Sequence, residues 1–268
     1  MNRVPSHAIY EKSSERNICN ICLKSATLTL DHVPPKAALP VRQVHVKPLF
    51  NRADRSVFSQ SGVKYRTLCV TCNRDRLGQS FDKALIAMCK QASRLHRNSA
   101  LLVQQPTVEI DPGQVLRSVL GHMLAAKDHT PRTKADEQMR AFFMDPASTD
   151  LGDLHVFYWA HPDRSIRMMR DTAVLEFGSS IEVVWCDLLV WYPIGFLVCD
   201  KLAYEMSCMN DYLGRPCPTL VPLRALASGV LERWFNRTGK VIGEPGESAF
   251  LAEHSCRPPS NRLVPRSE

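Results

Sequence analysis

The sequence has no long uninterrupted apolar segment. Its longest weakly charged apolar stretch, residues 183–199, contains Asp187 and Pro193 and is short for a membrane span. Residues 1–7 also lack the apolar core of a signal peptide. We therefore expect a cytoplasmic protein that does not cross a membrane.

The sequence also lacks the compositional bias of disordered or fibrous proteins. Charged residues make up 23% and apolar residues 44% of the 268 positions, as in ordinary globular domains. There is no Gly-rich nucleotide-binding loop, and no βαβ pattern of the thioredoxin type accompanies the cysteines. The length predicts one large domain or two small ones.

Positive charge is concentrated in the N-terminal third of the chain. Residues 1–100 contain 17 Lys and Arg against 6 Asp and Glu, whereas residues 101–268 contain 17 against 21. A basic segment of this kind favours a polyanionic partner, most simply nucleic acid. A solvated basic surface without a partner is the alternative at this point.

Four of the ten cysteines form two Cys-x-x-Cys pairs, Cys19 with Cys22 and Cys69 with Cys72, separated by 46 residues. Each pair can offer two thiolates to one ion, so the pattern predicts a four-cysteine structural zinc site. A disulfide scaffold is excluded in a cytoplasmic protein. The other six cysteines have no such spacing and are expected to be small buried apolar residues.

A short strand is predicted over residues 27–30, between the two cysteine pairs. Asp31-His32 follows it directly, and Pro34-Pro35 then ends the strand pairing. After the second cysteine pair comes Asn73, and an amphipathic helix is predicted over residues 79–97.

In this order, Cys-x-x-Cys, Asp-His-Val-Pro-Pro-Lys and Leu-Cys-x-x-Cys-Asn resemble an HNH endonuclease of the zinc-stapled ββα-metal type, over residues 17–90. The resemblance implies that His32 is the general base and that Asp31 and Asn73 hold a catalytic Mg²⁺ or Mn²⁺. These residue types suit the reaction, since a neutral imidazole can deprotonate water and hard cations prefer oxygen ligands. The zinc, with a full set of four ligands, would be structural only.

Simpler interpretations of these residues stay open. Asp31 can act as a turn residue, His32 as a surface residue, and Asn73 as the N-cap of the following helix. The chain also departs from the family pattern, because Lys64 occupies the position of the central Asn that usually holds the loop of the catalytic His.

Three basic residues are placed to contact phosphate, although solvated side chains are the alternative for each. They are Lys36, Arg74 and Arg76.

The remainder of the chain predicts helices followed by strands. Asp111-Pro112 marks a helix start, and a second helix is predicted over residues 134–143. Strand patterns then follow one another in a predicted antiparallel meander, over residues 155–159, 166–170, 174–177, 181–185 and 188–197. The fold class is therefore α+β. We expect an HNH-like domain over residues 1–100, a helical and β domain over 101–235, and a flexible tail over 236–268.

The function expected from these features is metal-dependent hydrolysis of phosphodiester bonds in DNA, with RNA as the alternative substrate. From the resemblance alone, a role in restriction or antiviral defence follows. One such unit holds one active site, so cutting both strands of a duplex would favour a homo-oligomer. The runner-up function is a non-catalytic zinc module that binds nucleic acid, and a third is a zinc fold that mediates protein contacts.

Overall fold

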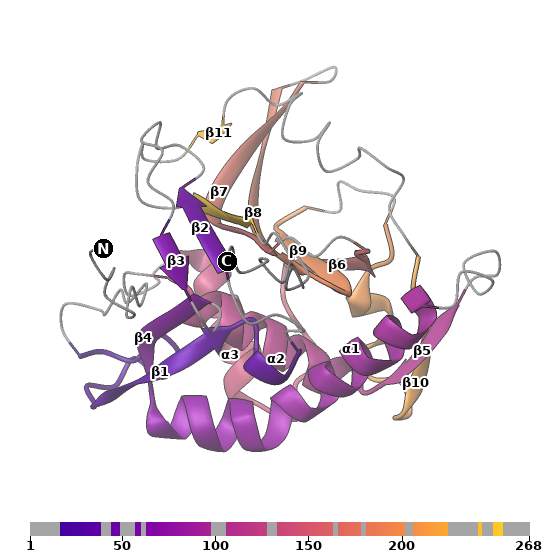
Figure 1. Cartoon of the computed structure of the whole chain (residues 1–268), viewed down its shortest axis with the longest axis horizontal. Helices are drawn as coiled ribbons and strands as arrows, with labels where there is room; N and C mark the ends of the chain where they lie inside the picture. Colours follow the sequence, from indigo (N-terminus) through magenta and orange to yellow (C-terminus); the bar gives the residue numbers. More distant parts are fainter. Residues whose placement is uncertain are drawn as a thin grey trace, which may run out of the picture.

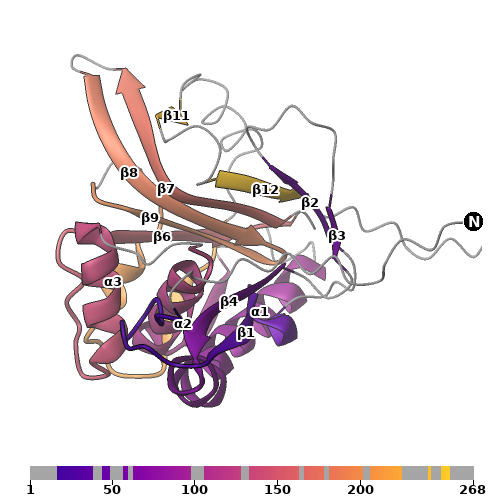
Figure 2. The same ribbon diagram turned by 90° about the vertical axis from the view of Figure 1, so that its left-hand side faces the viewer.

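The computed structural model describes residues 17–38, 44–48, 57–59, 63–97, 106–127, 133–162, 166–177, 181–201, 206–224, 241–242 and 249–253. Over these ranges the protein is of mixed α+β class, as expected, with three α-helices and antiparallel sheets. The helices and a small two-stranded sheet lie together below the larger sheet (Figures 1 and 2).

The elements follow one another along the chain without a repeated unit. The helical segments are η1 (Lys36–Ala38), η2 (Thr71–Phe81), α1 (Asp82–Arg97), α2 (Pro112–Ala125), α3 (Lys134–Met144) and η4 (Met209–Tyr212). The strands are β1 (Leu28–Val33), β2 (Val44–Pro48), β3 (Val57–Ser59), β4 (Val63–Cys69), β5 (Thr107–Ile110), β6 (His155–Ala160), β7 (Ile166–Phe177), β8 (Ile181–Trp191), β9 (Ile194–Cys199), β10 (Thr219–Pro222), β11 (Val241–Ile242) and β12 (Ala249–Glu253).

The strand predicted over residues 27–30 is β1, which runs from Leu28 to Val33 and pairs antiparallel with β4. Asp31 and His32 therefore lie within the strand and not after it. The chain passes from the end of β4 directly into η2, which is wound as a π-helix and continues as α1. The expected helix is therefore present, but helical winding begins at Thr71 instead of residue 79. Its first turns are mostly polar, with Leu77 among the few buried side chains, so apolar periodicity does not reveal them.

Two further helices begin where their capping residues predict. Asp111 accepts a hydrogen bond from the Gln114 backbone N–H at the start of α2. Thr133 and Asp136 form a reciprocal capping box at the start of α3. Both helices are thus specified locally by side chains that satisfy otherwise unpaired backbone N–H groups.

The larger sheet has eight strands and contains the predicted meander as β7-β8-β9-β6. Strand β6 pairs with β9, not with β7, and the patterns at 166–170 and 174–177 form one strand. The irregularity between them is at Asp171, where φ is +48° and the register with β8 shifts.

The larger sheet also takes strands from all three predicted segments of the chain. Strand β12 pairs with β2 on one side and with β7 on the other. The segment boundaries stay a prediction, and residues 236–240, 243–248 and 254–268 of the predicted tail lie outside the described residues.

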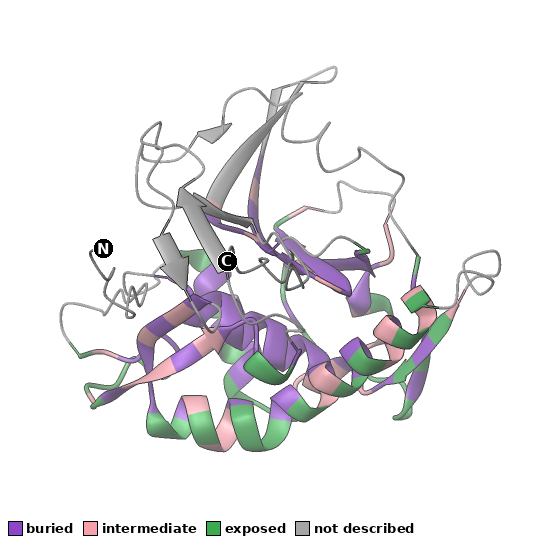
Figure 3. Ribbon diagram, in the orientation of Figure 1, coloured by how far each residue is buried: buried purple, intermediate pink, exposed green. Residues whose placement is uncertain are grey.

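Helix α2 occupies the centre of the molecule. It contacts η2, α1 and α3, both strands of the small sheet, and β8. Figure 3 shows it buried, whereas α1 exposes its outer side. Gly121 permits this close packing, because a Cβ there would lie 2.6 Å from the Phe143 ring and 2.7 Å from the Leu77 side chain. In the described ranges, no helix is long and apolar enough to cross a membrane.

A buried lysine joins α2 to α3 and to the larger sheet. The Lys127 ammonium group contacts the carboxylates of Asp136 and Asp171, and lies 3.2 Å from Oδ2 of Asp187. Burial lowers the pKa of Lys127, but the three carboxylates outweigh this effect and hold the pKa above its ordinary value. Burial also raises the pKa of Asp187 to about 7, although Lys127 opposes the change.

Candidate metal centre and the adjacent histidine

The four cysteines of the two Cys-x-x-Cys pairs come together, with their sulfur atoms within 4.8 Å of one another. Cys22 Sγ and Cys69 Sγ are 3.8 Å apart. Zinc bonded to four sulfurs at about 2.3 Å requires sulfur–sulfur separations of about 3.8 Å. The geometry therefore fits a tetrahedral metal ion, and the predicted four-cysteine site is present.

Local backbone bonds shape the first pair into a tight turn. The Leu23 N–H donates to the Cys19 carbonyl, and the Cys19 N–H donates to the Lys24 carbonyl. The second pair bridges two elements, because Cys69 ends β4 and Cys72 lies in the first turn of η2. A metal ion here would join the turn, the small sheet and the helix.

The sulfur atoms already favour a mixed charge state. The hydrogen bond with Cys72 lowers the pKa of Cys19 to about 5, and the same bond raises the pKa of Cys72. A thiolate is the form that binds metal, so Cys19 is prepared for coordination.

Asp31 points into the protein, where it meets a histidine from α2. Asp31 Oδ2 lies 3.0 Å from Nδ1 of His122, and Nε2 of His122 lies 3.0 Å from Oδ1 of Asp82. The Ser118 hydroxyl donates to the same Asp82 oxygen over 2.6 Å. His122 is fully buried, and the chain of bonds joins β1, α2 and α1.

His122 is held in its charged form. Burial lowers its pKa, but the Asp31 and Asp82 carboxylates outweigh burial and raise the pKa to about 10. In Asp82, burial opposes the change, yet His122 and then Ser118 lower the carboxyl pKa. As an imidazolium, His122 donates from both ring nitrogens.

His32 lies on the other face of β1, because neighbouring residues of a strand point to opposite sides. It stands opposite Lys64 of β4. Its Nε2 is buried without a hydrogen-bond partner among the described residues. Burial, followed by the charges of Lys64 and Lys36, lowers the pKa of His32, although Asp31 opposes them. A lowered pKa favours the neutral ring, which is the form in which a general base acts.

Asn73 ties the helix to β1. Its Nδ2 donates to Thr29 Oγ1 over 2.9 Å and to the Leu30 carbonyl over 3.0 Å. These two acceptors fix the orientation of the amide, so Oδ1 is the atom that could bind a cation. Asn73 lies within the first turn of η2, whose N-cap position is Val70, so it is not the cap.

In the described part of the chain, the four cysteines are the one group of three or more histidine, cysteine or acidic side chains close enough to share a metal ion. Asp31 and Asn73 both contact or belong to β1, but their joint binding of Mg²⁺ or Mn²⁺ stays a prediction.

The three predicted phosphate contacts differ in their surroundings. Lys36 is exposed in η1. Arg74 is exposed and pairs with Asp75 over 2.8 Å, and Arg76 donates to the Met144 carbonyl over 3.0 Å. Their contact with nucleic acid stays a prediction.

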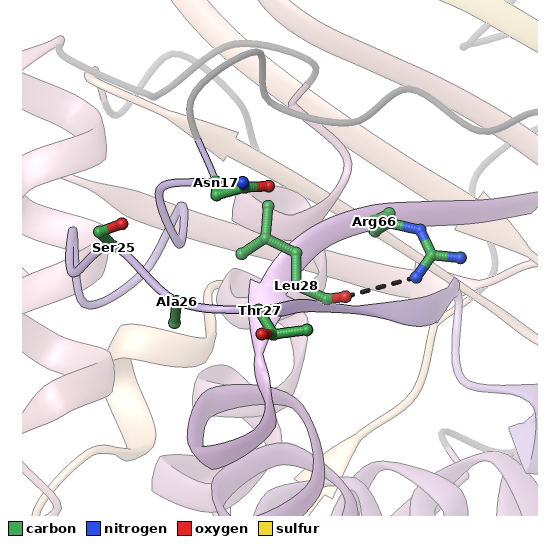
Figure 4. Close-up of a pocket in the computed structure, with 6 residues that line it drawn as sticks. All are labelled: Asn17, Ser25, Ala26, Thr27, Leu28 and Arg66. Atoms are coloured by element: carbon green, nitrogen blue, oxygen red, sulfur yellow. Dashed lines mark hydrogen bonds between the residues drawn. The ribbon is translucent and has the colours of Figure 1, made fainter.

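Two cations that are not among the predicted phosphate contacts lie on the same strand face as His32. Alternation along β4 puts Lys64 and Arg66 on the half-buried face, opposite His32 and Leu30 of β1. The sequence signal for this arrangement is the alternation of apolar and basic residues at positions 63–66. Arg66 also borders a hollow of about 420 Å³ beside the first cysteine turn, and donates to the Leu28 carbonyl over 3.4 Å (Figure 4).

Comparisons of the chain with protein-family models, with curated proteins and with solved structures found no match.

Proposed function

We propose that this protein is a metal-dependent endonuclease of the HNH type that hydrolyses phosphodiester bonds in DNA. The observation that carries the proposal is the position of His32. It is an imidazole with a lowered pKa opposite Lys64, on a strand that Asn73 ties to the helix following the fourth cysteine. The order strand, strand, helix around a four-cysteine cluster supports the same class.

In this proposal the two metal sites have separate tasks. The four cysteines hold zinc, which joins the first turn, the small sheet and η2 without taking part in the reaction. Asp31 and Asn73 hold a Mg²⁺ or Mn²⁺ ion, which supplies stabilisation of charge at the scissile phosphate.

The chain's own residues then bind the substrate and move a proton. Lys64 and Arg66 attract the phosphate backbone to the face that carries His32. In this proposal the imidazole of His32 accepts a proton from the attacking water. The water oxygen then bonds to phosphorus, the P–O bond to the leaving sugar oxygen breaks, and solvent supplies the proton that this oxygen takes up.

Replacement of His32 tests the proposal directly. We expect His32→Ala to reduce the rate of plasmid cleavage by about 10²- to 10⁴-fold, because the general base is lost. Zinc content and thermal melting should stay unchanged, since His32 is no zinc ligand. The assay compares Mg²⁺, Mn²⁺ and EDTA on supercoiled DNA, with single-stranded RNA as a parallel substrate.

His155→Ala is the matched control, since His155 is another half-buried histidine, on β6 of the larger sheet. It should cut like the wild type. Wild-type cleavage that survives in His32→Ala would exclude His32 as the base. Cleavage of RNA but not of DNA would support the proposed reaction and would make RNA the substrate.

A non-catalytic zinc module that binds nucleic acid is the second candidate. The missing central Asn, whose position Lys64 occupies, favours it. In that case neither the wild type nor His32→Ala cuts DNA, and binding to DNA weakens steeply with added salt.

A further inference from the structure

We propose that His122 is a positioning residue that holds Asp31 as the ligand of a divalent cation. This inference rests on the proposed function, and it assigns part of the cation site to α2, outside the cysteine-containing segment. His122 is 91 residues from Asp31 in the sequence, so motif spacing does not reveal the pair.

The contact engages one oxygen of an almost fully buried carboxylate. Nδ1 of His122 donates to Oδ2 of Asp31 from a ring with no exposed area. The Asp31 side chain keeps 8% of its area exposed. A carboxylate held by one oxygen keeps the other oxygen for a cation.

The histidine itself is immobilised from its other side. Nε2 of His122 donates to Asp82, and the Ser118 hydroxyl donates to the same carboxylate oxygen. The neighbouring residue Gly121 lets α2 pack closely against η2 and α3. The ring therefore has two hydrogen bonds and sits on a closely packed helix.

Such outer contacts matter for metal ligands in general. Mutation of a residue that orients a metal ligand commonly lowers metal affinity by about 10- to 100-fold. We expect the bond from His122 to Asp31 to have this effect, and the bond to Asp82 to serve only in holding the ring.

Two variants separate these bonds. In His122→Asn the side-chain nitrogen takes the place of Nδ1, so the bond to Asp31 is kept while that to Asp82 is lost. In His122→Gln the nitrogen takes the place of Nε2, so the bond to Asp82 is kept while that to Asp31 is lost. Both remove the imidazole from the same buried position, so each controls for the other.

The measurement is the Kd of Mn²⁺ for the zinc-loaded full-length protein, read from the EPR signal of free Mn²⁺. We expect His122→Gln to weaken binding by about 10- to 100-fold and His122→Asn to stay within about 3-fold of wild type. Cleavage should show the same order in kcat at saturating DNA, with KM for DNA little changed. Equal Mn²⁺ affinity in the two variants would overturn the proposal.

A second measurement needs no variant and covers the outcome in which either one fails to fold. In wild-type protein with ¹⁵N-labelled histidine, sub-stoichiometric Mn²⁺ should broaden the ring signals of His122 before those of His155, and Mg²⁺ should reverse the effect. Absence of selective broadening overturns the proposal. Selective Mn²⁺ binding without cleavage of DNA or RNA instead refutes the nuclease and leaves the cation site beside His122 standing.

Discussion

Cys69→Ser is expected to lose the bound zinc and to unfold the region around the four cysteines. Structural zinc in small zinc-binding peptides contributes about 10–16 kcal/mol of apparent binding free energy, which is also folding free energy. The serine hydroxyl is a poor replacement for a thiolate, because it stays protonated at pH 7. Cys69 also joins β4 to η2, so its loss releases both elements.

The effect should reach beyond the cluster itself. The side chain of Asn20, within the first cysteine turn, donates to the carbonyls of Leu124 and Lys127 at the end of α2. Once the turn loosens, the Lys127 carbonyl loses this partner, which costs about 1–3 kcal/mol for an unsatisfied buried group. The Leu124 carbonyl keeps a bond from the Lys127 N–H. We therefore expect the whole helical layer to lose stability with the zinc.

Zinc content by elemental analysis and urea unfolding of the same samples measure the outcome. The control is Cys217→Ser, because Cys217 is exposed and distant in sequence from both pairs. It should keep one zinc per chain and wild-type stability. Unchanged zinc content and unfolding in Cys69→Ser would contradict the four-cysteine site.

Lys127→Met is expected to reduce the free energy of unfolding by about 3–5 kcal/mol, the usual cost of removing one partner of a buried ion pair. Methionine fills a similar volume, so the loss reports on charge more than on packing. The ammonium group contacts Asp136, Asp171 and Asp187. Its removal leaves these three carboxylates without a positive charge beside them. Urea unfolding monitored by circular dichroism measures the change.

Asp187→Asn is the matched control for this prediction. Asn keeps the Oδ1 acceptor for the Asp171 backbone N–H, which lies 2.6 Å away. Because burial raises the pKa of Asp187 to about 7, an uncharged side chain resembles its protonated state near neutral pH. We expect a change well below that of Lys127→Met. Equal effects of the two substitutions would show that the lysine charge is not what stabilises this cluster.

Features decided by neighbouring residues were predictable from the sequence. The small strand ends where Pro34-Pro35 removes backbone donors, and α2 begins where Asp111 caps it. The cysteine pairs also meet as their spacing predicts. In the first two cases a short stretch of chain contains both the group that needs a partner and the group that supplies it. Each cysteine pair instead supplies two ligands and needs the other pair to complete a four-ligand site.

Features decided by packing were predictable only in part. The start of the long helix at Thr71 was missed, because its first turns are mostly polar and carry no clear apolar period. The pairing of β12 with β2 and β7 was missed as well, since the strands come from opposite ends of the chain. Register between distant strands depends on the assembled sheet, which no local pattern encodes.

The sequence by itself determined the α+β class, the four-cysteine cluster, and the presence of Asp31, His32 and Asn73 in one strand–helix unit. Only the tertiary structure decided that Asp31 meets His122 while His32 lies on the opposite, half-buried face of β1 beside Lys64. The alternation of side chains along a strand predicts that the two residues point to opposite sides, but not which element packs against each side. That depends on α2 being buried at the centre, where a polar side chain must find a partner and the partner comes from wherever the fold brings one.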